Sequence, residues 1–227
     1  VALREACRIS GLAIVRAMQE TRPGAGEWML DAAASRVHRL AGAGGPAYFP
    51  IVGSGPNSCI LHYYRNTRRM AEGEVVLMDY GCEWNHYASD ITRTWPVSGK
   101  FSARQRFVYQ AVLEAQQAAI AVVKPGVTFT EMNRAATRVL ADKGLVGAIR
   151  HGANHFIGLA THDVGGAGPL PAGAVFTVEP GAYLERESLG VRIEDVVLVT
   201  EDGFEVLSVG CPKEIDEIED LVGAHHR

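Results

Sequence analysis

The sequence predicts an α/β (α+β) domain of two similar halves, with antiparallel sheets facing each other and helices outside. First, a helix pair split by a basic-Pro-Gly break occurs twice, and apolar segments bounded by Gly follow each pair. Second, chemically similar residues recur 102, 100, 100 and 104 positions apart: Pro23 and Pro125, His62 and His162, Asp79 and Glu179, Asp90 and Glu194. Chance repetition in an α/β chain is the alternative, but parallel offsets favour duplication. We therefore expect one domain over residues 1–227, with repeats at about 1–100 and 101–210.

The first half begins with two predicted helices. Apolar residues at helical spacing predict one from Val1 to about Gln19, which Thr21-Arg22-Pro23-Gly24 ends, and another from Glu27 to Leu40. Short apolar segments predict strands at 48–52, 59–64 and 75–81. Residues 87–94 should form a strand antiparallel to 75–81, and Trp95-Pro96 should end it.

The second half repeats this order. Helices are predicted from Ala103 to about Val122 and from Phe129 to Lys143, where Gly144 closes the second helix. The histidine-rich stretch 150–166 reads as a strand or bend, and 171–181 repeats the turn and strand of 72–81.

Composition restricts the class of protein. The chain has 227 residues, 47% of them hydrophobic and 21% charged, which is enough to bury a full core. A net charge of −4 argues against nucleic acid as a partner, although the local patch Arg65, Arg68 and Arg69 would attract an anionic ligand. Four scattered cysteines indicate a reducing, cytoplasmic location, and no apolar run is long enough to cross a membrane. The chain starts at Val1 already in helical rhythm, which indicates that an upstream segment is missing.

Three histidines lie within twelve residues, at 151, 155 and 162, and acidic residues end several of the predicted strands. Singly, each is more easily read as a surface acid or a core histidine. Together, four carboxylates and one imidazole suit two divalent cations, because carboxylates bridge ions and four negative charges balance four positive ones. Such ions lower the pKa of water from about 15.7 towards 7, so metal-assisted hydrolysis is indicated. The oxygen-rich, thiol-free set favours Mn²⁺ over Co²⁺, Fe²⁺, Mg²⁺ or Zn²⁺.

Five motifs carry a family resemblance: Leu77-Met-Asp79-Tyr-Gly81, Ser89-Asp90-Ile-Thr-Arg-Thr-Trp-Pro96, His151-Gly-x-x-His155-x-x-Gly-x-x-x-His162-Asp-Val-Gly165, Val178-Glu179-Pro-Gly181 and Arg192-Ile-Glu194-Asp195. From about Leu3 to Asp220 the chain resembles the catalytic domain of the aminopeptidase P and prolidase group. The resemblance implies the pita-bread fold, which is creatinase/aminopeptidase-like. Within the group, the sequence looks closer to Xaa-Pro aminopeptidase than to methionine aminopeptidase.

The resemblance also implies roles for individual residues. It implies five metal ligands, of which Asp90 and Glu194 would bridge two ions: Asp79, Asp90, His155, Glu179 and Glu194. Glu179 would also act as general base. His62 and His162 would contact the peptide and stabilise the tetrahedral intermediate, and His151 would lie near the substrate. Tyr183 and Arg192 would support the site.

The expected activity is release of the N-terminal residue from peptides with proline in second position. Alternatives are a prolidase that cleaves only Xaa-Pro dipeptides, a catalytically silent peptide-binding module, and a creatinase-type amidinohydrolase. The N-terminal domain usual in this group is not apparent, and the segments 144–151 and 183–192 look short, so dipeptide or longer-peptide preference stays open. A homodimer is one option for assembly.

Overall fold

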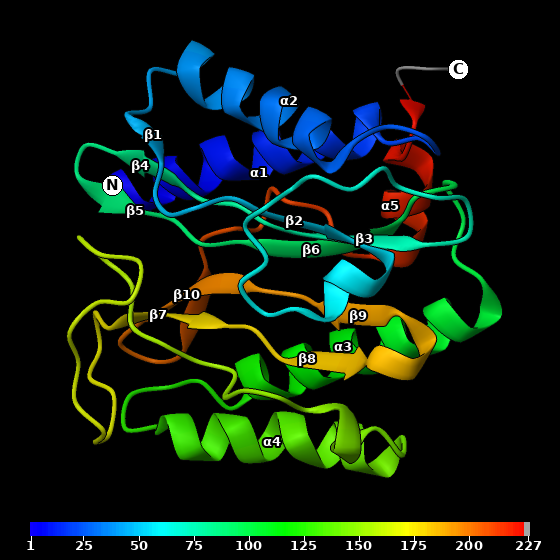
Figure 1. Ribbon diagram of the computed structural model, residues 1–227. Helices are drawn as coiled ribbons and strands as arrows, with labels where there is room; N and C mark the ends of the chain where they lie inside the picture. The colour runs from blue at the N-terminus through cyan, green and yellow to red at the C-terminus, as the bar shows by residue number, and fades with distance from the viewer. Residues whose placement is uncertain (225–227) are drawn as a thin grey trace.

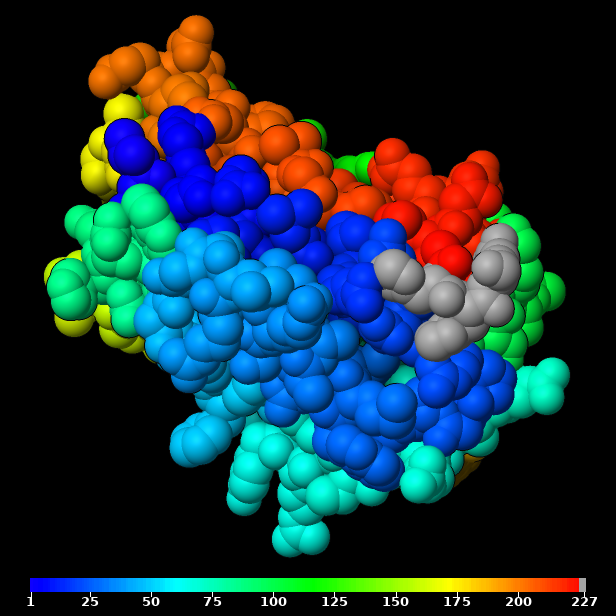
Figure 2. Space-filling view, turned by 90° about the horizontal axis from the view of Figure 1, so that it is seen from above, coloured from blue at the N-terminus to red at the C-terminus, as the bar shows by residue number. Residues whose placement is uncertain are grey.

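The computed structural model describes residues 1–224, which form four layers (Figure 1). Helices α1 (Ala2–Glu20) and α2 (Glu27–Leu40) cover one side, and α3 (Ala103–Ala121) and α4 (Phe129–Asp142) cover the other. Strands of the two halves lie between these helix pairs, and α5 (Ile215–Leu221) packs beside α1. Seen from above, α1 and α2 cover much of one face in blue (Figure 2).

Each half contains a three-stranded antiparallel sheet. The first has the order β2-β3-β6 and the second the order β11-β10-β7. Their bounds are β2 (Ile51–Ser54), β3 (Val75–Asp79), β6 (Thr92–Pro96), β7 (Val175–Val178), β10 (Asp195–Val199) and β11 (Phe204–Val206). The pair β3 and β6 corresponds to the pair β7 and β10. The third strand differs in its place, because β2 lies beside β3 in the first sheet, whereas β11 lies beside β10 in the second.

The remaining strands form smaller sheets. Strands β8 (Gly181–Leu184) and β9 (Leu189–Arg192) form a hairpin, and β4 (Cys82–Trp84) pairs between β1 (Gly45–Pro46) and β5 (Tyr87–Ala88). Three short 3₁₀ helices connect other elements: η1 (Gly55–Cys59), η2 (Val146–Ala148) and η3 (Glu185–Glu187).

Local sequence explains where the helices begin and turn. Ser102 and Thr128 cap α3 and α4, and each forms a reciprocal capping box with the residue three positions later. The two basic-Pro-Gly breaks share one backbone conformation, because Gly24 has φ +83° and Gly126 has φ +91°. Glycine adopts this left-handed conformation without steric cost. The repeated sequence signal thus corresponds to a repeated turn.

The two halves are joined through buried polar contacts as well as apolar packing. The Arg93 side chain on β6 reaches Asp195 on β10 at 2.7 Å, and both side chains are fully buried. The Glu194 backbone N–H donates to the Thr92 carbonyl at 3.0 Å. These contacts hold the start of β6 against the start of β10 and the loop before it. The expected fold class is confirmed.

Four predicted strands were wrong in extent or type, and the one expected at 75–81 ends at Asp79. Residues 59–64 lie at the end of η1 and in an irregular loop, because no described strand pairs with this backbone. The strand expected at 48–52 begins only at Ile51, and that expected at 87–94 is divided into β5 and β6. The stretch 150–166 is irregular except for one bridge between Phe156 and Phe176. Among residues 1–224, no helix is long and apolar enough to span a membrane.

Candidate metal centre

All five predicted metal ligands line one cavity of about 270 Å³. They come from strand ends and loops of both halves: Asp79 ends β3, Asp90 lies between β5 and β6, His155 lies in the loop before β7, Glu179 follows β7, and Glu194 lies between β9 and β10. His62, His151, His162 and Arg192 line the same cavity. The structure therefore brings together residues up to 132 positions apart, from His62 to Glu194.

His155 faces three of the carboxylates. Its Nε2 atom lies 3.4 Å from Asp90, 3.5 Å from Glu179 and 3.9 Å from Glu194. Its Nδ1 atom lies 3.0 Å from the Phe156 carbonyl, which can only accept a hydrogen bond. Nδ1 therefore carries the proton, and Nε2 is left to bind a cation, as in many metal-binding histidines.

The carboxylates gather without enough protein cations to balance them. Burial, with Asp79 close by, raises the pKa of Asp90 well above its usual value. Burial, with Asp90 and Glu179 close by, does the same for Glu194. Glu194 Oε2 accepts a hydrogen bond from Thr92 at 2.7 Å, whereas its buried Oε1 has no partner among the described residues.

An unpaired buried carboxylate oxygen is costly unless a cation binds it. Single oxygen or nitrogen atoms of Asp90, His155 and Glu194 lie within 4.8 Å of one another, which allows one ion to contact all three. The donor set, its charge and the unpaired oxygen all fit a metal centre built mainly from carboxylates.

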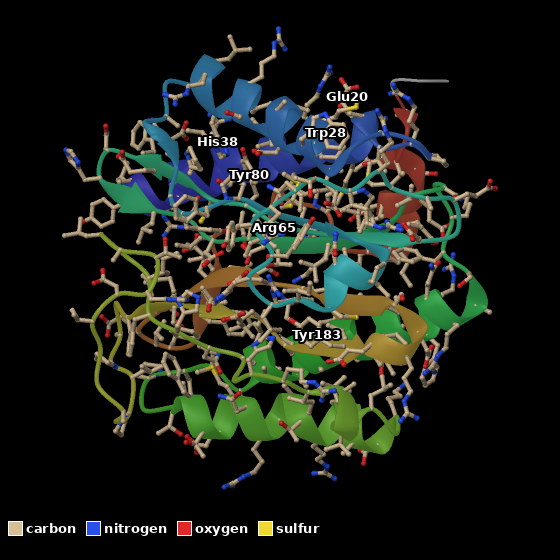
Figure 3. The ribbon with its side chains drawn as sticks, viewed as in Figure 1. Glu20, Trp28, His38, Arg65, Tyr80 and Tyr183 are labelled. Carbon is tan, nitrogen blue, oxygen red and sulfur yellow. The ribbon has the colours of Figure 1, made fainter. Side chains whose placement is uncertain are left out.

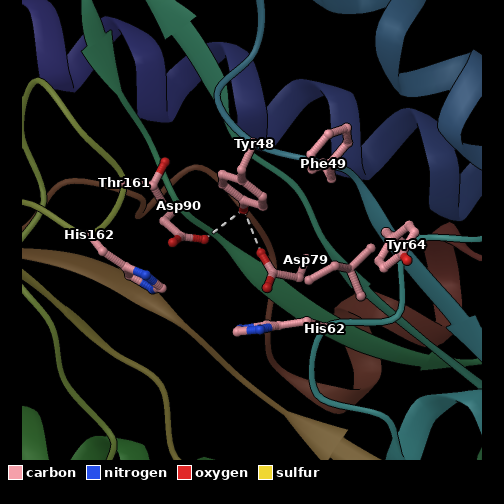
Figure 4. Close-up of a pocket in the computed structure, with 9 residues that line it drawn as sticks. Tyr48, Phe49, His62, Tyr64, Asp79, Asp90, Thr161 and His162 are labelled. Carbon is pink, nitrogen blue, oxygen red and sulfur yellow. Dashed lines mark hydrogen bonds between the residues drawn. The ribbon is translucent and has the colours of Figure 1, made fainter.

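Asp79 differs from the other acids because it has a permanent cation beside it. Arg192 Nη2 donates to Asp79 Oδ2 at 2.7 Å, and Arg192 is buried. The Tyr48 hydroxyl contacts Asp79 as well and lies 2.6 Å from Asp90 (Figure 4). Arg192 and Tyr48 thus fix the orientation of two of the acids.

Arg192 also begins a chain of hydrogen bonds to the cleft. Its Nη1 donates to the Tyr183 hydroxyl at 2.9 Å, and that hydroxyl lies 2.8 Å from His151 Nε2. His151 Nδ1 donates to the Gly152 carbonyl at 2.8 Å, so Nε2 accepts from Tyr183. Burial, with Arg192 nearby, lowers the pKa of His151 to about 4. His151 is therefore a neutral imidazole with a fixed tautomer.

His62 and His162 face the same space from different segments. Their ring centroids are 6.5 Å apart, and the His162 ring lies 4.3 Å from that of His155. Figure 4 shows both rings pointing toward the acids. Burial lowers the pKa of His162. An adjoining cavity of about 250 Å³ is lined by both histidines, by Asp79 and Asp90, and by the aromatic side chains Tyr48, Phe49 and Tyr64.

Sequence reasoning assigned no role to Tyr48 or Thr92. Tyr48 lies just before β2, and its only sequence signal was an aromatic residue two positions before Pro50. Thr92 lies within the motif around Asp90, but its contact with Glu194 crosses between the two halves. Contacts across 42 and 102 positions cannot be read from local patterns.

Comparisons with known proteins agree with this geometry. The model of metallopeptidase family M24 matches residues 1–201. The chain is 39% identical to a Xaa-Pro aminopeptidase of Haemophilus influenzae, over 97% of this chain and 58% of that protein. It is 38% identical to the mitochondrial intermediate cleaving peptidase 55 of Arabidopsis thaliana, over 98% of this chain and 50% of that protein.

Solved structures show the same fold. Aminopeptidase P from Escherichia coli with the inhibitor Pro-Leu matches with a TM-score of 0.94 and 37% identity, over 99% of this chain and 58% of that one. A zinc-substituted form of the Escherichia coli enzyme with product matches with a TM-score of 0.94 and 36% identity, over 100% of this chain and 58% of that one. The chain thus spans little more than half the length of these relatives.

Proposed function

Because the chain belongs to metallopeptidase family M24, we propose that it is the catalytic part of a metal-dependent Xaa-Pro aminopeptidase, an exopeptidase that releases the N-terminal residue from peptides with proline in second position. The observation that carries this proposal is the single cavity lined by four acids and His155, in which a buried Glu194 oxygen has no partner among residues 1–224. The similar proteins of Haemophilus influenzae and Escherichia coli are named Xaa-Pro aminopeptidase, which supports the choice of peptide. The proposed catalytic unit covers residues 1–227 in two repeats.

Five residues would hold two divalent ions, with Asp90 and Glu194 shared between them: Asp79, Asp90, His155, Glu179 and Glu194. Mn²⁺ is the ion that this oxygen-rich set favours. When bound, such ions lower the pKa of a water molecule and polarise the carbonyl of the scissile bond. The chain's own residues then have to bind the peptide, orient it and move protons.

Glu179 is the proposed general base. Burial raises its pKa to about 7, although Arg192 and His155 act against this shift. A carboxylate beside the bound water can accept its proton and return that proton to the leaving amine. Its side chain is 16% exposed, so the group can be reached from the cleft.

His62 and His162 are proposed to contact the peptide. They lie on the open side of the acids, where each ring can donate to a carbonyl oxygen on which negative charge develops. The lowered pKa of His162 makes it a neutral donor near pH 7. His151, Tyr183 and Arg192 are proposed to support the pocket wall through their hydrogen-bond chain.

The adjoining aromatic cavity suits the first residue of the peptide. Its acids attract the free α-amino group, while Tyr48, Phe49 and Tyr64 contact the side chain. An Xaa-Pro bond has no N–H, so binding proline leaves no donor unsatisfied, whereas an ordinary peptide bond has one. Selection for proline and for a free amino terminus follow from these two features.

The test uses protein reconstituted with Mn²⁺ and four matched peptides. We expect hydrolysis of Ala-Pro-Ala at the Ala-Pro bond, much slower hydrolysis of Ala-Ala-Ala, no hydrolysis of N-acetyl-Ala-Pro-Ala, and slower hydrolysis of the dipeptide Ala-Pro. Products are identified by mass spectrometry, and metal content is measured in the same samples. The Asp90→Asn protein serves as the inactive control.

Each contrary result has a separate meaning. Equal rates on Ala-Pro-Ala and Ala-Ala-Ala would refute the proline preference but leave metal-dependent hydrolysis standing. A faster rate on Ala-Pro than on Ala-Pro-Ala would assign a prolidase. Absence of both stoichiometric metal and hydrolysis would instead assign a silent module.

A further inference from the structure

His62 lies on a segment that forms neither a helix nor a strand. Residues 60–74 connect η1 to β3 and form turns and irregular backbone, with one bridge at Arg69. The His62 side chain lines the cleft, 6.5 Å from His162 between ring centroids. An irregular loop has many conformations open to it, so a histidine on such a loop needs other contacts to fix its position.

One buried carboxylate contacts two residues of this loop and two residues that precede it. Glu27 is the first residue of α2 and has no solvent exposure. Its Oε1 accepts hydrogen bonds from the Ser54 backbone N–H at 2.7 Å, the Ser54 hydroxyl at 2.8 Å and the Asn57 amide at 3.1 Å. Its Oε2 accepts from the Tyr63 hydroxyl and from the Arg68 backbone N–H, both at 2.9 Å.

These donors lie on both sides of His62 in the sequence. Ser54 and Asn57 precede it, Tyr63 is its immediate neighbour, and Arg68 follows it. The Glu27 backbone N–H also donates to the Arg68 carbonyl at 2.9 Å, so side chain and backbone together bind the far end of the loop. One side chain therefore closes the loop that carries His62 and ties both ends to α2.

The charge of Glu27 makes these contacts stronger than ordinary hydrogen bonds. Hydrogen bonds to a carboxylate are shorter and roughly twice as strong as neutral ones. Five donors occupy the two oxygens, which offer about four lone-pair sites, so one site is shared and none is left for further ligands. Glu27 thus belongs to no metal site, and its side chain joins this loop to β2 and η1.

We propose that Glu27 is a positioning residue for His62, acting through Tyr63 and Arg68 to hold the imidazole where the proposed aminopeptidase needs it. The proposal rests on the proposed function for its effect on rate. It does not depend on that function for the contact between Glu27 and the loop. Glu27 itself touches neither substrate nor metal ligands.

The test is a double-mutant cycle with Glu27→Gln and His62→Ala. The Gln amide keeps the size of the side chain but turns an –NH₂ donor toward the donors of the loop. We expect Glu27→Gln to lower kcat and kcat/KM on Ala-Pro-Ala together by about 10-fold to 100-fold, with bound metal unchanged. His62→Ala should lower them by about 10²–10³-fold, and the double variant should match His62→Ala within about 3-fold.

Glu219→Gln is the matched control. Glu219 is likewise a buried carboxylate with several donors, from Lys100, Phe101 and Arg106, but it lies on α5 away from His62. We expect it to lower thermal stability and leave kcat/KM unchanged. Tyr63→Phe removes one donor beside His62 while keeping the ring, and should lower kcat less than Glu27→Gln. Tyr63→Phe replaces Glu27→Gln in the double-mutant cycle if Glu27→Gln does not fold.

A second readout does not depend on activity. In metal-free protein labelled with ¹³C-histidine, the His62 ring signal is assigned from its absence in His62→Ala. Glu27→Gln should shift or broaden that signal and leave the signal of His38 in α2 unchanged, whereas Glu219→Gln should change neither. An unchanged His62 signal in Glu27→Gln would overturn the proposal.

Two kinetic outcomes would also overturn it. One is a Glu27→Gln rate equal to that of the wild type. The other is a double variant whose loss is the product of the two single losses, because Glu27 would then act elsewhere than through His62. A wild-type protein without Xaa-Pro hydrolysis refutes the proposed function alone, since the histidine spectra still decide the contact.

Discussion

Replacing Glu179 with Gln should change how the stability of the metal-free protein responds to pH. Burial raises the pKa of Glu179 from 4.5 to about 7 in the folded state. The folded protein therefore holds this proton more tightly than the unfolded chain, and ionisation of Glu179 opposes folding as pH rises between those two values. At about 1.4 kcal/mol per pH unit, the full penalty above pH 7 is about 3 kcal/mol.

The measurement is urea unfolding with a chelator present, monitored by circular dichroism at pH 5, 6, 7 and 8. The glutamine side chain in Glu179→Gln does not ionise, so the free-energy penalty of ionisation is absent from that variant. We expect the variant to be close to wild type in free energy of unfolding at pH 5 and about 2–3 kcal/mol more stable at pH 8. Asp90 and Glu194 remain in both proteins, but Glu179 helps to raise their pKa values, so they should ionise at lower cost in the variant and add to its advantage at pH 8.

Glu187→Gln is the control of opposite sign. Glu187 is exposed, and its hydrogen bond with Arg104 lowers its pKa, so this variant should lose a little stability at pH 8 and less at pH 5. Added Mn²⁺ at pH 8 should stabilise wild type more than Glu179→Gln, because it neutralises the charge that opposes folding. A free-energy difference between wild type and Glu179→Gln that is the same at pH 5 and pH 8 would refute the reasoning.

Three further predictions concern the other ligands and one buried histidine. Asp90→Asn and Glu194→Gln should each lose activity and about half or more of the bound metal, measured by elemental analysis, since both acids are proposed to bridge. His155→Ala should lose metal, whereas His162→Ala should keep it and lose about 10²–10³-fold in kcat; equal metal loss in both would remove the distinction. Burial lowers the pKa of His38 from 6.5 to about 4, and neither of its ring nitrogens has a hydrogen-bond partner among the described residues. The contribution of neutral His38 to stability is therefore complete above about pH 6.5 and falls as pH drops towards 4. Between pH 7 and pH 4 the free energy of unfolding, measured with urea, should fall in wild type by up to about 3 kcal/mol more than in His38→Leu.

Buried polar groups far from the cleft show how packing determines these pKa values. Figure 3 places His38 and Tyr80 between α2 and the sheet beneath it, where their ring centroids are 4.9 Å apart. The Tyr80 hydroxyl donates to Asp31 at 2.9 Å, but His38 has no hydrogen-bond partner within residues 1–224. The sequence shows both residues, but only the tertiary structure shows that one is paired and the other is not.

The sequence alone predicted helices α1 to α4 and the fold class, and it singled out the four acids that line the cavity. Helix bounds are local, because capping residues such as Ser102 and Thr128 and turn glycines such as Gly24 act within a few positions. The nearly constant spacings from which we predicted a duplication by themselves pair Asp79 with Glu179. Such signals survive in sequence because each depends on near neighbours or on a fixed offset.

Only the tertiary structure decided the contacts that join distant segments. The loop at 59–64 is apolar enough to suggest a strand, yet its neighbourhood is held by the Glu27 carboxylate from another element, which local pattern cannot reveal. Tyr48 between Asp79 and Asp90, and the pairing of Arg192 with Asp79, likewise depend on how the two halves pack. Burial and charge proximity are properties of that packing, and so the pKa values of the carboxylates are set by the fold.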